Sequence, residues 1–210
     1  MRFDPAGRPF VIAGFGVAAL VGAMAGWAWG GAACVLPAFF LFFFRDPDRL
    51  IQAAAGAVLS PADGKVMVVG PPIGDFAGTD WVQVSIFLSP LDVHVNRMPI
   101  GGRVTRVRYH PGRFLPAYRR EAGDLNEYTE VTLDAGGRQV IVRQIVGVLA
   151  RRIVCRVREG DLVTTGARFG VMKFGSRMDV FLPPATALHV HVGERVVGGV
   201  SVIATLGQRP

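Results

Sequence analysis

Cysteine, lysine and charged residues in general are scarce in this chain of 210 residues. The two cysteines, Cys34 and Cys155, stand far apart, which excludes a disulfide framework and the close spacing of a zinc site. A reducing compartment is therefore the default. Charged residues account for only 19% of the chain, hydrophobic residues for 50%, and the mean hydropathy is +0.37. This composition indicates that part of the chain lies in lipid.

Acidic residues are too few to balance the basic ones, and the formal net charge is +7. Arginine carries nearly all of the positive charge, because Lys65 and Lys173 are the only lysines. Arginine binds phosphate through two parallel hydrogen bonds. A basic chain of this kind fits nucleic acid or anionic lipid until a membrane segment decides between them. The sequence also lacks a glycine-rich phosphate loop, a dinucleotide-binding fingerprint and an internal repeat.

The longest run without charge extends from Pro9 to Phe44. A helix needs about 20 apolar residues to cross a bilayer, so this run is too long for one straight span and barely long enough for two. Its middle, Gly26–Gly31, is rich in glycine and tryptophan, as a turn at the membrane interface would be. We therefore predict a membrane hairpin within residues 1–50, with helices near Phe10–Trp27 and Ala32–Phe44.

Arginines flank the apolar run on both sides. Arg2 and Arg8 precede it, and Arg45 and Arg49 follow it. Positive charge at both ends predicts that both ends lie on the cytoplasmic side, as a hairpin allows and a single span does not. A cleaved signal peptide is a poor alternative, because no small-residue cleavage site follows the run. The other alternative is a buried hairpin of a soluble protein. We predict a protein of the cell membrane with its remaining residues, 51–210, on the cytoplasmic side.

Residues 51–210 carry the short apolar and alternating runs that are typical of β-strands. Val58–Val69 is predicted to form two strands joined by a tight turn at Asp63-Gly64. Gly102–Tyr109 alternates apolar and basic residues, and we expect it to bury one face and expose its arginines. The glycines of Gly160–Gly170 are spaced as in small barrels that carry lipoyl groups. Further strands are predicted at Trp81–Leu88, Glu130–Leu133, Gln139–Val148, Ile153–Val157, Ala187–Val192 and Gly193–Thr205.

The predicted fold class is therefore mostly β (α+β), a small lipoyl-like β-sheet domain joined to an N-terminal transmembrane helical hairpin. Near the end of this domain, apolar residues such as Val171, Phe174 and Val180 flank the pair Gly175-Ser176. Most Gly-Ser pairs are hairpin turns or bulges, and that is the simplest interpretation here. The alternative is a self-cleaving peptide bond, which the pair alone does not establish.

Four segments, in order along the chain, resemble the phosphatidylserine decarboxylases, in their short membrane-anchored bacterial and archaeal form. The resemblance extends from about Phe42 to Leu182, downstream of the predicted hairpin. Each segment is weak alone, and the specificity comes from their order. The segments are Phe43-Phe44-Arg45-Asp46-Pro47, Ser60-Pro61-Ala62-Asp63-Gly64, Phe87-Leu88-Ser89-Pro90-Leu91-Asp92-Val93-His94 and Phe174-Gly175-Ser176.

The resemblance implies a proenzyme that cleaves itself between Gly175 and Ser176 into a β-chain, residues 1–175, and an α-chain, residues 176–210. Ser176 would become a covalent pyruvoyl group, and neither a metal nor pyridoxal phosphate would be needed. The pyruvoyl ketone would form a Schiff base with phosphatidylserine and accept the electrons left by CO2, giving phosphatidylethanolamine. The implied partners are phosphatidylserine, an anionic membrane surface and the protein's own two chains. A homo-oligomer is left open.

The resemblance also implies roles for individual residues. Ser176 is the nucleophile, and Gly175 has no Cβ to crowd the tetrahedral intermediate. Asp63 matches the family's catalytic aspartate, although Asp-Gly is also a common hairpin turn. His94 matches the first histidine of the family's histidine-containing segment, and histidine suits proton transfer near neutral pH. A lone histidine in an apolar stretch is otherwise most often packed and hydrogen-bonded.

Two positions depart from the family pattern. Arg97 stands where the better-known long-chain members have a second histidine, and Arg177 stands where many members have a small hydroxyl residue. Arg97 and Arg113 are predicted to bind the phosphate or carboxylate of the substrate. The basic stretch Arg97–Arg120 is interleaved with aromatic residues and could bind single-stranded nucleic acid. The predicted membrane hairpin favours anionic headgroups, and no nucleic-acid partner is expected.

Two alternatives to this function are kept. The first is a non-enzymatic, membrane-anchored, lipoyl-like β-barrel adaptor, which gives Ser176 no special role and predicts one intact chain. The second keeps the pyruvoyl chemistry but acts on another amine-bearing lipid. The membrane hairpin favours a lipid over a soluble amino acid, but the sequence does not define the headgroup.

Overall fold

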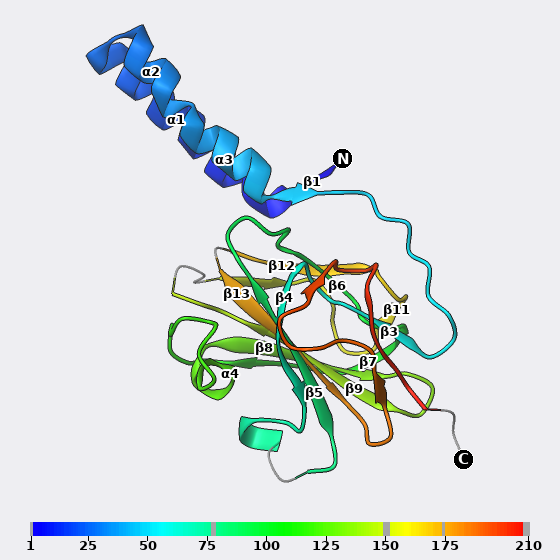
Figure 1. Cartoon of the computed structure of the whole chain (residues 1–210). Helices are drawn as coiled ribbons and strands as arrows, with labels where there is room; N and C mark the ends of the chain where they lie inside the picture. Colours follow the sequence, from blue (N-terminus) through cyan, green and yellow to red (C-terminus); the bar gives the residue numbers. More distant parts are fainter. Residues whose placement is uncertain (1, 77–78, 149–151, 174, 208–210) are drawn as a thin grey trace. The chain divides into compact units, whose positions relative to one another are not determined.

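The computed structural model describes residues 2–76, 79–148, 152–173 and 175–207 (Figure 1). The chain divides into two compact units, Met1–Asp48 and Arg49–Pro210, and each is described by itself. The first unit is helical apart from one short strand pair, and the second is built almost entirely of strands. The prediction of a mostly β protein with N-terminal helices is confirmed.

The first unit is a helical hairpin. Gly22 and Gly30 let its two arms approach closely, because a Cβ on Gly30 would press on the backbone of Gly22. Near the open end, the rings of Phe10 and Phe40 are 5.5 Å apart. The elements are β1 (Arg2–Phe3), η1 (Pro5–Gly7), α1 (Arg8–Ala25), α2 (Trp27–Ala33), α3 (Val35–Phe43) and β2 (Arg45–Asp46), and β1 pairs with β2.

The turn of the hairpin differs from its prediction. Gly26 alone reverses the chain, with φ +96°, a conformation that favours glycine. The rest of the predicted turn is the first part of α2, since the amide groups of Trp29 and Gly30 already donate to the carbonyl of Gly26. The packing of Gly30 against Gly22 offsets the low helix propensity of glycine, so the predicted turn Gly26–Gly31 was too long.

By length and composition, one helix among the described residues could cross a membrane, Pro5–Ala25, and the other apolar helix, Trp27–Phe43, is shorter. The arms expose much of their apolar surface, as a unit placed in lipid would. Two of these side chains, Met24 and Trp27, are 81% and 89% exposed. The large apolar side chains exposed on this unit are Ile12, Phe15, Val17, Leu20, Met24, Trp27, Trp29, Val35, Leu36, Leu41 and Phe42.

The second unit contains an eight-stranded antiparallel sheet in the order β11-β7-β8-β9-β13-β5-β4-β15, and two three-stranded sheets, β10-β12-β6 and β14-β16-β3. The short helices η2 (Gly74–Phe76) and α4 (Ala122–Leu125) lie in its loops. The strands are β3 (Ala57–Leu59), β4 (Gly64–Gly70), β5 (Val82–Leu88), β6 (Val95–Arg97), β7 (Gly102–His110), β8 (Tyr128–Asp134), β9 (Gln139–Ile145), β10 (Ile153–Cys155), β11 (Leu162–Val163), β12 (Arg168–Met172), β13 (Ser176–Leu182), β14 (Ala187–Leu188), β15 (Arg195–Val196) and β16 (Val202–Thr205).

The core lies between the large sheet and the two small ones. It contains Ile86 and Val180 from the large sheet, Met172 and Phe169 from one small sheet and Ile203 from the other. Strand β13 is the most deeply placed, because it pairs with β5 on one side and β9 on the other and all seven of its residues are buried. Ser176 is its first residue.

The predicted turn at Asp63-Gly64 and the simpler interpretation of Gly175-Ser176 are wrong for a shared reason. Asp63-Gly64 does not close a hairpin, because β3 pairs with β16 whereas β4 pairs with β5 and β15. Likewise, Gly175-Ser176 is not a hairpin turn or a bulge, because β12 and β13 belong to different sheets. In both places the chain crosses from one sheet to another. Gly64 is needed instead because a Cβ there would overlap the carbonyl oxygen of Phe87.

The predicted amphipathic strand is β7, and its alternation is largely confirmed. Val104 is buried and Val107 is half-buried, while Arg103, Arg106 and Arg108 are exposed. A bulge between Val104 and Arg106 keeps the two valines on one face despite their spacing of three. Tyr109 departs from the expected alternation, because its side chain is 59% exposed.

Candidate functional site

The pair Gly175-Ser176 lies where the chain enters the central strand β13. Ser176 is fully buried, opposite Leu88 of β5, and its Oγ has no hydrogen-bond partner in the part of the chain that the structure describes. A buried hydroxyl without a partner loses the hydrogen bonds that water would give it, so it calls for an explanation. The third residue of the motif, Phe174, lies outside the described residues.

Gly175 has φ +73°, in the left-handed region. A residue with a side chain pays about 1–2 kcal/mol for that conformation, whereas glycine does not. Glycine is expected here for this conformational freedom, and also because a Cβ would crowd the tetrahedral intermediate. However, no described atom outside its chain neighbours lies within 4 Å of where that Cβ would be. In this state the backbone conformation, rather than crowding, accounts for glycine at this position.

His94 contacts the same backbone. It is fully buried, its Nδ1 lies 2.9 Å from the carbonyl oxygen of Asp92, and the amide of Gly175 donates to its Nε2 at 3.4 Å. A carbonyl only accepts and an amide only donates, so this pattern requires the proton on Nδ1 and the lone pair on Nε2. Imidazole in this tautomer presents a base to the residue that precedes Ser176.

The loop that carries His94 is held in place by a carboxylate. Asp92 accepts hydrogen bonds from the amide and the hydroxyl of Ser89, at 2.8 and 2.7 Å, and from the guanidinium of Arg195, at 2.5 Å. Because Asp92 is two residues from His94 and its own carbonyl contacts the ring, these bonds fix the orientation of the imidazole.

Gly147 packs directly against the Gly175 carbonyl, a contact that the sequence analysis missed. It follows β9 and is buried, and a Cβ placed on it would overlap the carbonyl oxygen of Gly175. The nearest other atom is the Cβ of Ala117, at 3.3 Å from that position. Glycine is therefore required here by the close approach of two backbones. Only knowledge that β9 neighbours β13 would have identified it.

A buried amide pair lies on the same face of the large sheet as Ser176. The Nε2 of Gln144, on β9, donates to the Oδ1 of Asn96, on β6, at 2.8 Å. Both side chains are fully buried, and the remaining amide atoms, Oε1 of Gln144 and Nδ2 of Asn96, have no partner among the described residues. Residues alternate along extended chain, so Asn96 points to the same side as His94.

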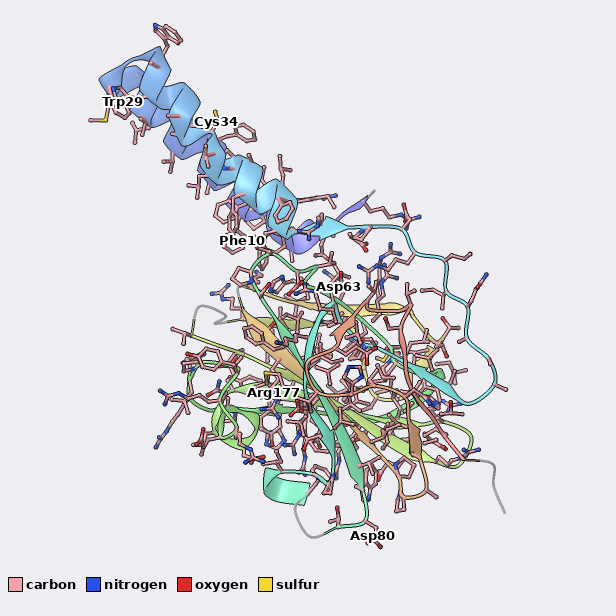
Figure 2. The ribbon with its side chains drawn as sticks, viewed as in Figure 1. Phe10, Trp29, Cys34, Asp63, Asp80 and Arg177 are labelled. Atoms are coloured by element: carbon pink, nitrogen blue, oxygen red, sulfur yellow. The ribbon has the colours of Figure 1, made fainter. Side chains whose placement is uncertain are left out.

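Asp63 is placed differently from the expectation. Its carboxylate binds Arg49 through two hydrogen bonds of 2.6 and 2.7 Å and accepts the amide of Gly198 at 2.8 Å. In the described part of the chain it makes no hydrogen bond to His94 or Ser176. Asp63 and Arg177, which follows the serine, lie well apart in Figure 2.

The two arginines predicted to bind substrate also lie elsewhere. Arg97 is buried in β6, donates to the carbonyl of Gly166 at 3.2 Å and packs against Gly199. Arg113 is exposed in the loop after β7, where its backbone bridges to Asn126. Neither side chain lines the pocket at Gly175 described next.

A small apolar pocket of about 160 Å³ opens at Gly175. Its walls come from the end of β5 and the loop after it, from the loop before α4 and from the chain after β9. Tyr118, which lines the pocket, is 62% exposed, and Leu91, which follows the lining residue Pro90 in the sequence, is 68% exposed. The pocket is lined by Phe87, Pro90, Pro116, Ala117, Tyr118, Gly147, Val148 and Gly175.

The other face of β13 carries a buried ion pair. Arg177 donates to both oxygens of Asp179, at 2.6 and 2.8 Å, and to the hydroxyl of Ser85 at 3.1 Å, and both charged side chains are 1% exposed. Asp179 thus neutralises the arginine that departs from the family pattern, since a buried guanidinium needs a partner.

Neither cysteine belongs to this site. Cys34 is exposed in the first unit, and Cys155 is half-buried in β10 with its sulfur 3.9 Å from the carbonyl of Val157. Burial raises the pKa of the Cys155 thiol. The thiol is therefore protonated at neutral pH and a poor nucleophile.

Comparison with known proteins gives a consistent family. The family model for phosphatidylserine decarboxylase matches residues 36–204. A phosphatidylserine decarboxylase proenzyme of Gluconacetobacter diazotrophicus is 46% identical over 214 residues, covering 98% of this chain and 95% of its own. That of Granulibacter bethesdensis is 45% identical over 208 residues, covering 96% and 84%. That of Nitrosomonas europaea is 41% identical over 199 residues, covering 94% and 92%.

Proposed function

Because the chain belongs to the phosphatidylserine decarboxylase family, we propose that it cleaves itself between Gly175 and Ser176 and that Ser176 supplies the pyruvoyl group. Decarboxylation of phosphatidylserine by a serine-derived pyruvoyl group is the family's activity, and it is the activity of this chain. One observation carries the assignment to this bond. The buried Oγ of Ser176 has no partner among the described residues, and it adjoins a left-handed glycine whose amide contacts the base His94.

The residues fit the first chemical step. The Oγ of Ser176 attacks the carbonyl carbon of Gly175, the bond from that carbon to the nitrogen of Ser176 breaks, and an ester remains. His94 accepts the hydroxyl proton on Nε2 and returns a proton to the departing nitrogen. Gly147 leaves room for the Gly175 oxygen as its carbon becomes tetrahedral. Loss of the Ser176 α-proton then breaks the bond between the Cβ of Ser176 and the ester oxygen, which releases the Gly175 carboxylate and leaves dehydroalanine at position 176. Water hydrolyses this dehydroalanine, so that a keto oxygen takes the place of the nitrogen and ammonia leaves.

Once formed, the pyruvoyl group supplies a ketone that condenses with the substrate amine and accepts the electrons released with CO2. The chain's own residues exclude water and position the lipid. The pocket at Gly175 is predominantly apolar, which suits the expulsion of water around a departing carboxylate. We assign to His94 the proton that is delivered to the former α-carbon of the lipid, because the imidazole faces this backbone from a buried position.

The two chains remain associated after cleavage, as the family's proenzymes imply, and strand pairing explains how. The α-chain would begin with β13, which lies between β5 and β9 of the β-chain. It would continue with β15 and β16, which pair with β4 and β3 of the β-chain. Removing the α-chain would therefore open the large sheet at its centre and expose the core on both sides of it.

For Asp63 we propose a positioning role rather than proton transfer. Its two oxygens are occupied by Arg49 and the amide of Gly198, so it ties the beginning of the second unit to the turn before β16. Among the described residues, its carboxylate makes no hydrogen bond to the Ser176 hydroxyl or the His94 ring, so it is not placed to transfer a proton between them. In this role Asp63 stabilises the crossing between β3 and β4.

If that is correct, Asp63→Asn and Arg49→Gln slow self-cleavage to a similar degree, by roughly tenfold, because each breaks the same pair. Cleavage is followed on denaturing gels during refolding or cell-free synthesis. The double variant should be little slower than either single one, as for two residues that act together. If Asp63 acted directly in catalysis, Asp63→Asn would slow self-cleavage and Arg49→Gln would not.

We also propose that the first unit spans the membrane as a hairpin with both ends on the cytoplasmic side. Its apolar side chains face outward, and arginines stand at both ends of the apolar run. The catalytic unit would then act at the cytoplasmic surface, where anionic lipid is available. The exposed apolar residues around the pocket at Gly175 suit entry of a lipid from that surface.

The adaptor hypothesis has less support than the decarboxylase. A lipoyl-like adaptor needs no reactive serine, and it does not account for a buried hydroxyl without a partner next to a buried histidine. The glycines of Gly160–Gly170 serve local packing, since a Cβ on Gly170 would press on the side chain of Gln144.

Reduction by borohydride tests the carbonyl at position 176. Borohydride converts a ketone to an alcohol, so treatment should abolish CO2 release from phosphatidylserine and add about 2 Da to the α-chain at its first residue. Untreated enzyme carried through the same buffer is the control. Full activity after treatment, with no change in the mass of the α-chain, would exclude a pyruvoyl group derived from Ser176.

A further inference from the structure

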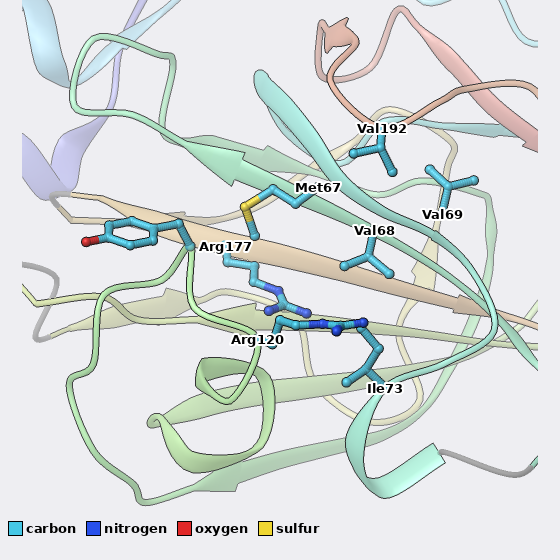
Figure 3. A pocket seen from close by; sticks show the side chains of 8 residues that line it. Met67, Val68, Val69, Ile73, Arg120, Arg177 and Val192 are labelled. Atoms are coloured by element: carbon cyan, nitrogen blue, oxygen red, sulfur yellow. The ribbon is translucent and has the colours of Figure 1, made fainter.

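A second pocket, of about 340 Å³, lies on the face of β13 opposite to Ser176. Two arginines reach into it from different elements. Arg177 extends from β13 and Arg120 extends from the loop before α4, as Figure 3 shows. Much of the remaining lining is apolar and comes from β4 and the loop after it, including Val68, Val69 and Ile73.

The two guanidinium groups differ in how their charge is neutralised. Arg177 is bound through two hydrogen bonds to Asp179. The guanidinium of Arg120 has no hydrogen bond and no ion pair to any residue that the structure describes. Nearby carboxylates are occupied, because Asp124 and Glu130 both bind Arg143. Glu121, next to Arg120, is exposed on the same loop. The pocket therefore presents one cation without a partner, beside an apolar wall.

A cation beside an apolar wall suits an amphiphilic anion. Guanidinium forms paired hydrogen bonds with phosphate oxygens, and valine and isoleucine side chains would contact the carbon chain attached to them. A soluble dianion would gain nothing from the apolar side, whereas a phosphodiester with a glyceryl group would use both sides of the pocket.

Two features link this pocket to the reaction site. Arg177 follows Ser176 directly in β13, so its backbone is one residue from the reacting carbonyl. Tyr118 lines both this pocket and the apolar pocket at Gly175. The headgroup of phosphatidylserine separates its amine from its phosphate by only three atoms. An amine at position 176 would place the phosphate near the next residue along the strand.

We propose that this pocket binds the phosphodiester of the phospholipid substrate and that Arg120 is the cation that contacts it. The proposal rests on the reaction at Ser176, and it assigns to Arg120 the task that the sequence suggested for Arg97 and Arg113. Arg177 forms the wall of the pocket, and Asp179 keeps its guanidinium in place.

The test uses the mature, lipid-reconstituted enzyme with phosphatidylserine in mixed micelles. Arg120→Gln should raise KM for phosphatidylserine roughly ten- to hundredfold, as expected for the loss of a charged hydrogen bond. Arg120→Lys should recover part of that loss, because lysine keeps the charge but not the paired geometry. Arg119→Gln is the matched control, since it removes an exposed arginine next door that does not line the pocket.

Three outcomes would overturn the proposal. An unchanged KM in Arg120→Gln would mean that the pocket does not bind the substrate. An equal rise in Arg119→Gln, with equal loss of binding to vesicles of phosphatidylglycerol, would mean general attraction to an anionic surface. If Arg120→Gln lost inhibition by inorganic phosphate but kept an unchanged KM for phosphatidylserine, the pocket would be a site for free phosphate and not for the lipid. Self-cleavage needs no substrate, so the masses of the two chains show separately whether the protein cleaves at Ser176, whatever the outcome for Arg120.

Discussion

Gly147→Ala is expected to slow self-cleavage by about 100-fold or more while leaving the protein folded. A methyl group at this position would overlap the carbonyl oxygen of Gly175, so the oxygen must move away and take the reacting carbon with it. A displacement of about 1 Å in reacting groups costs on the order of 100-fold in rate. The measurement is the half-time of conversion from one chain to two, followed by gel or by mass.

The chain offers two controls for this variant. Gly31→Ala adds a methyl group at a glycine where, apart from its chain neighbours and its own helix backbone, no described atom lies within 4 Å of the new Cβ, and it should cleave like the wild type. Ala117→Gly combined with Gly147→Ala removes the second-nearest contact, at 3.3 Å, but not the carbonyl. Recovery of cleavage in that double variant would show that the methyl group meets a side chain, and that Gly147 has no direct effect on the reacting bond.

His94→Gln is expected to slow self-cleavage by roughly 10²- to 10⁴-fold, the usual contribution of a general base. Glutamine keeps an acceptor that can take the amide hydrogen bond of Gly175, so the local structure should persist. It cannot accept the proton of the Ser176 hydroxyl at neutral pH. The half-time of cleavage is measured together with the temperature of unfolding, which separates lost chemistry from lost stability.

His94→Ala provides the comparison. It removes both the base and the hydrogen bond, and it leaves a cavity in a fully buried position. If His94 acts as a base, glutamine and alanine slow cleavage to a similar extent, although alanine destabilises the protein more. Normal cleavage in His94→Gln would contradict this role and would reduce His94 to a hydrogen-bond acceptor that holds Gly175 in its left-handed conformation.

The sequence predicts the helices and strands of this protein better than it predicts which strands pair with one another. The absence of charge from Pro9 to Phe44 was sufficient to predict a helical hairpin, because backbone groups in an apolar run must bond within a helix. The hairpin turn predicted at Asp63-Gly64 was wrong because strand pairing, unlike helix formation, is decided by residues far away in the sequence. Turn propensity is local, whereas the choice of β16 as the partner of β3 depends on residues about 140 positions away.

The candidate site shows the same division. Ser176 and His94 could be selected because each lies in a motif that resembles the family, and the structure places the imidazole of His94 against the amide of Gly175, next to Ser176. Gly147 and Gln144 carry no such signal, since their roles depend on β9 lying beside β13. Arg177 and Asp179 are two residues apart on a strand, so the sequence places their side chains on the same face. Their burial could not be predicted in this way, because charged side chains are mostly exposed.

The central claim, cleavage between Gly175 and Ser176 with conversion of Ser176 to pyruvoyl, is tested most directly by intact-mass measurement of the wild type beside Ser176→Ala. The account predicts two chains in the wild type, with the smaller about 17 Da lighter than encoded residues 176–210, because Ser176 loses its amino group and its hydroxyl and gains a keto oxygen, a net loss of ammonia. It predicts one whole chain in the variant. A single uncut chain in both samples, from folded and membrane-bound protein, would contradict it.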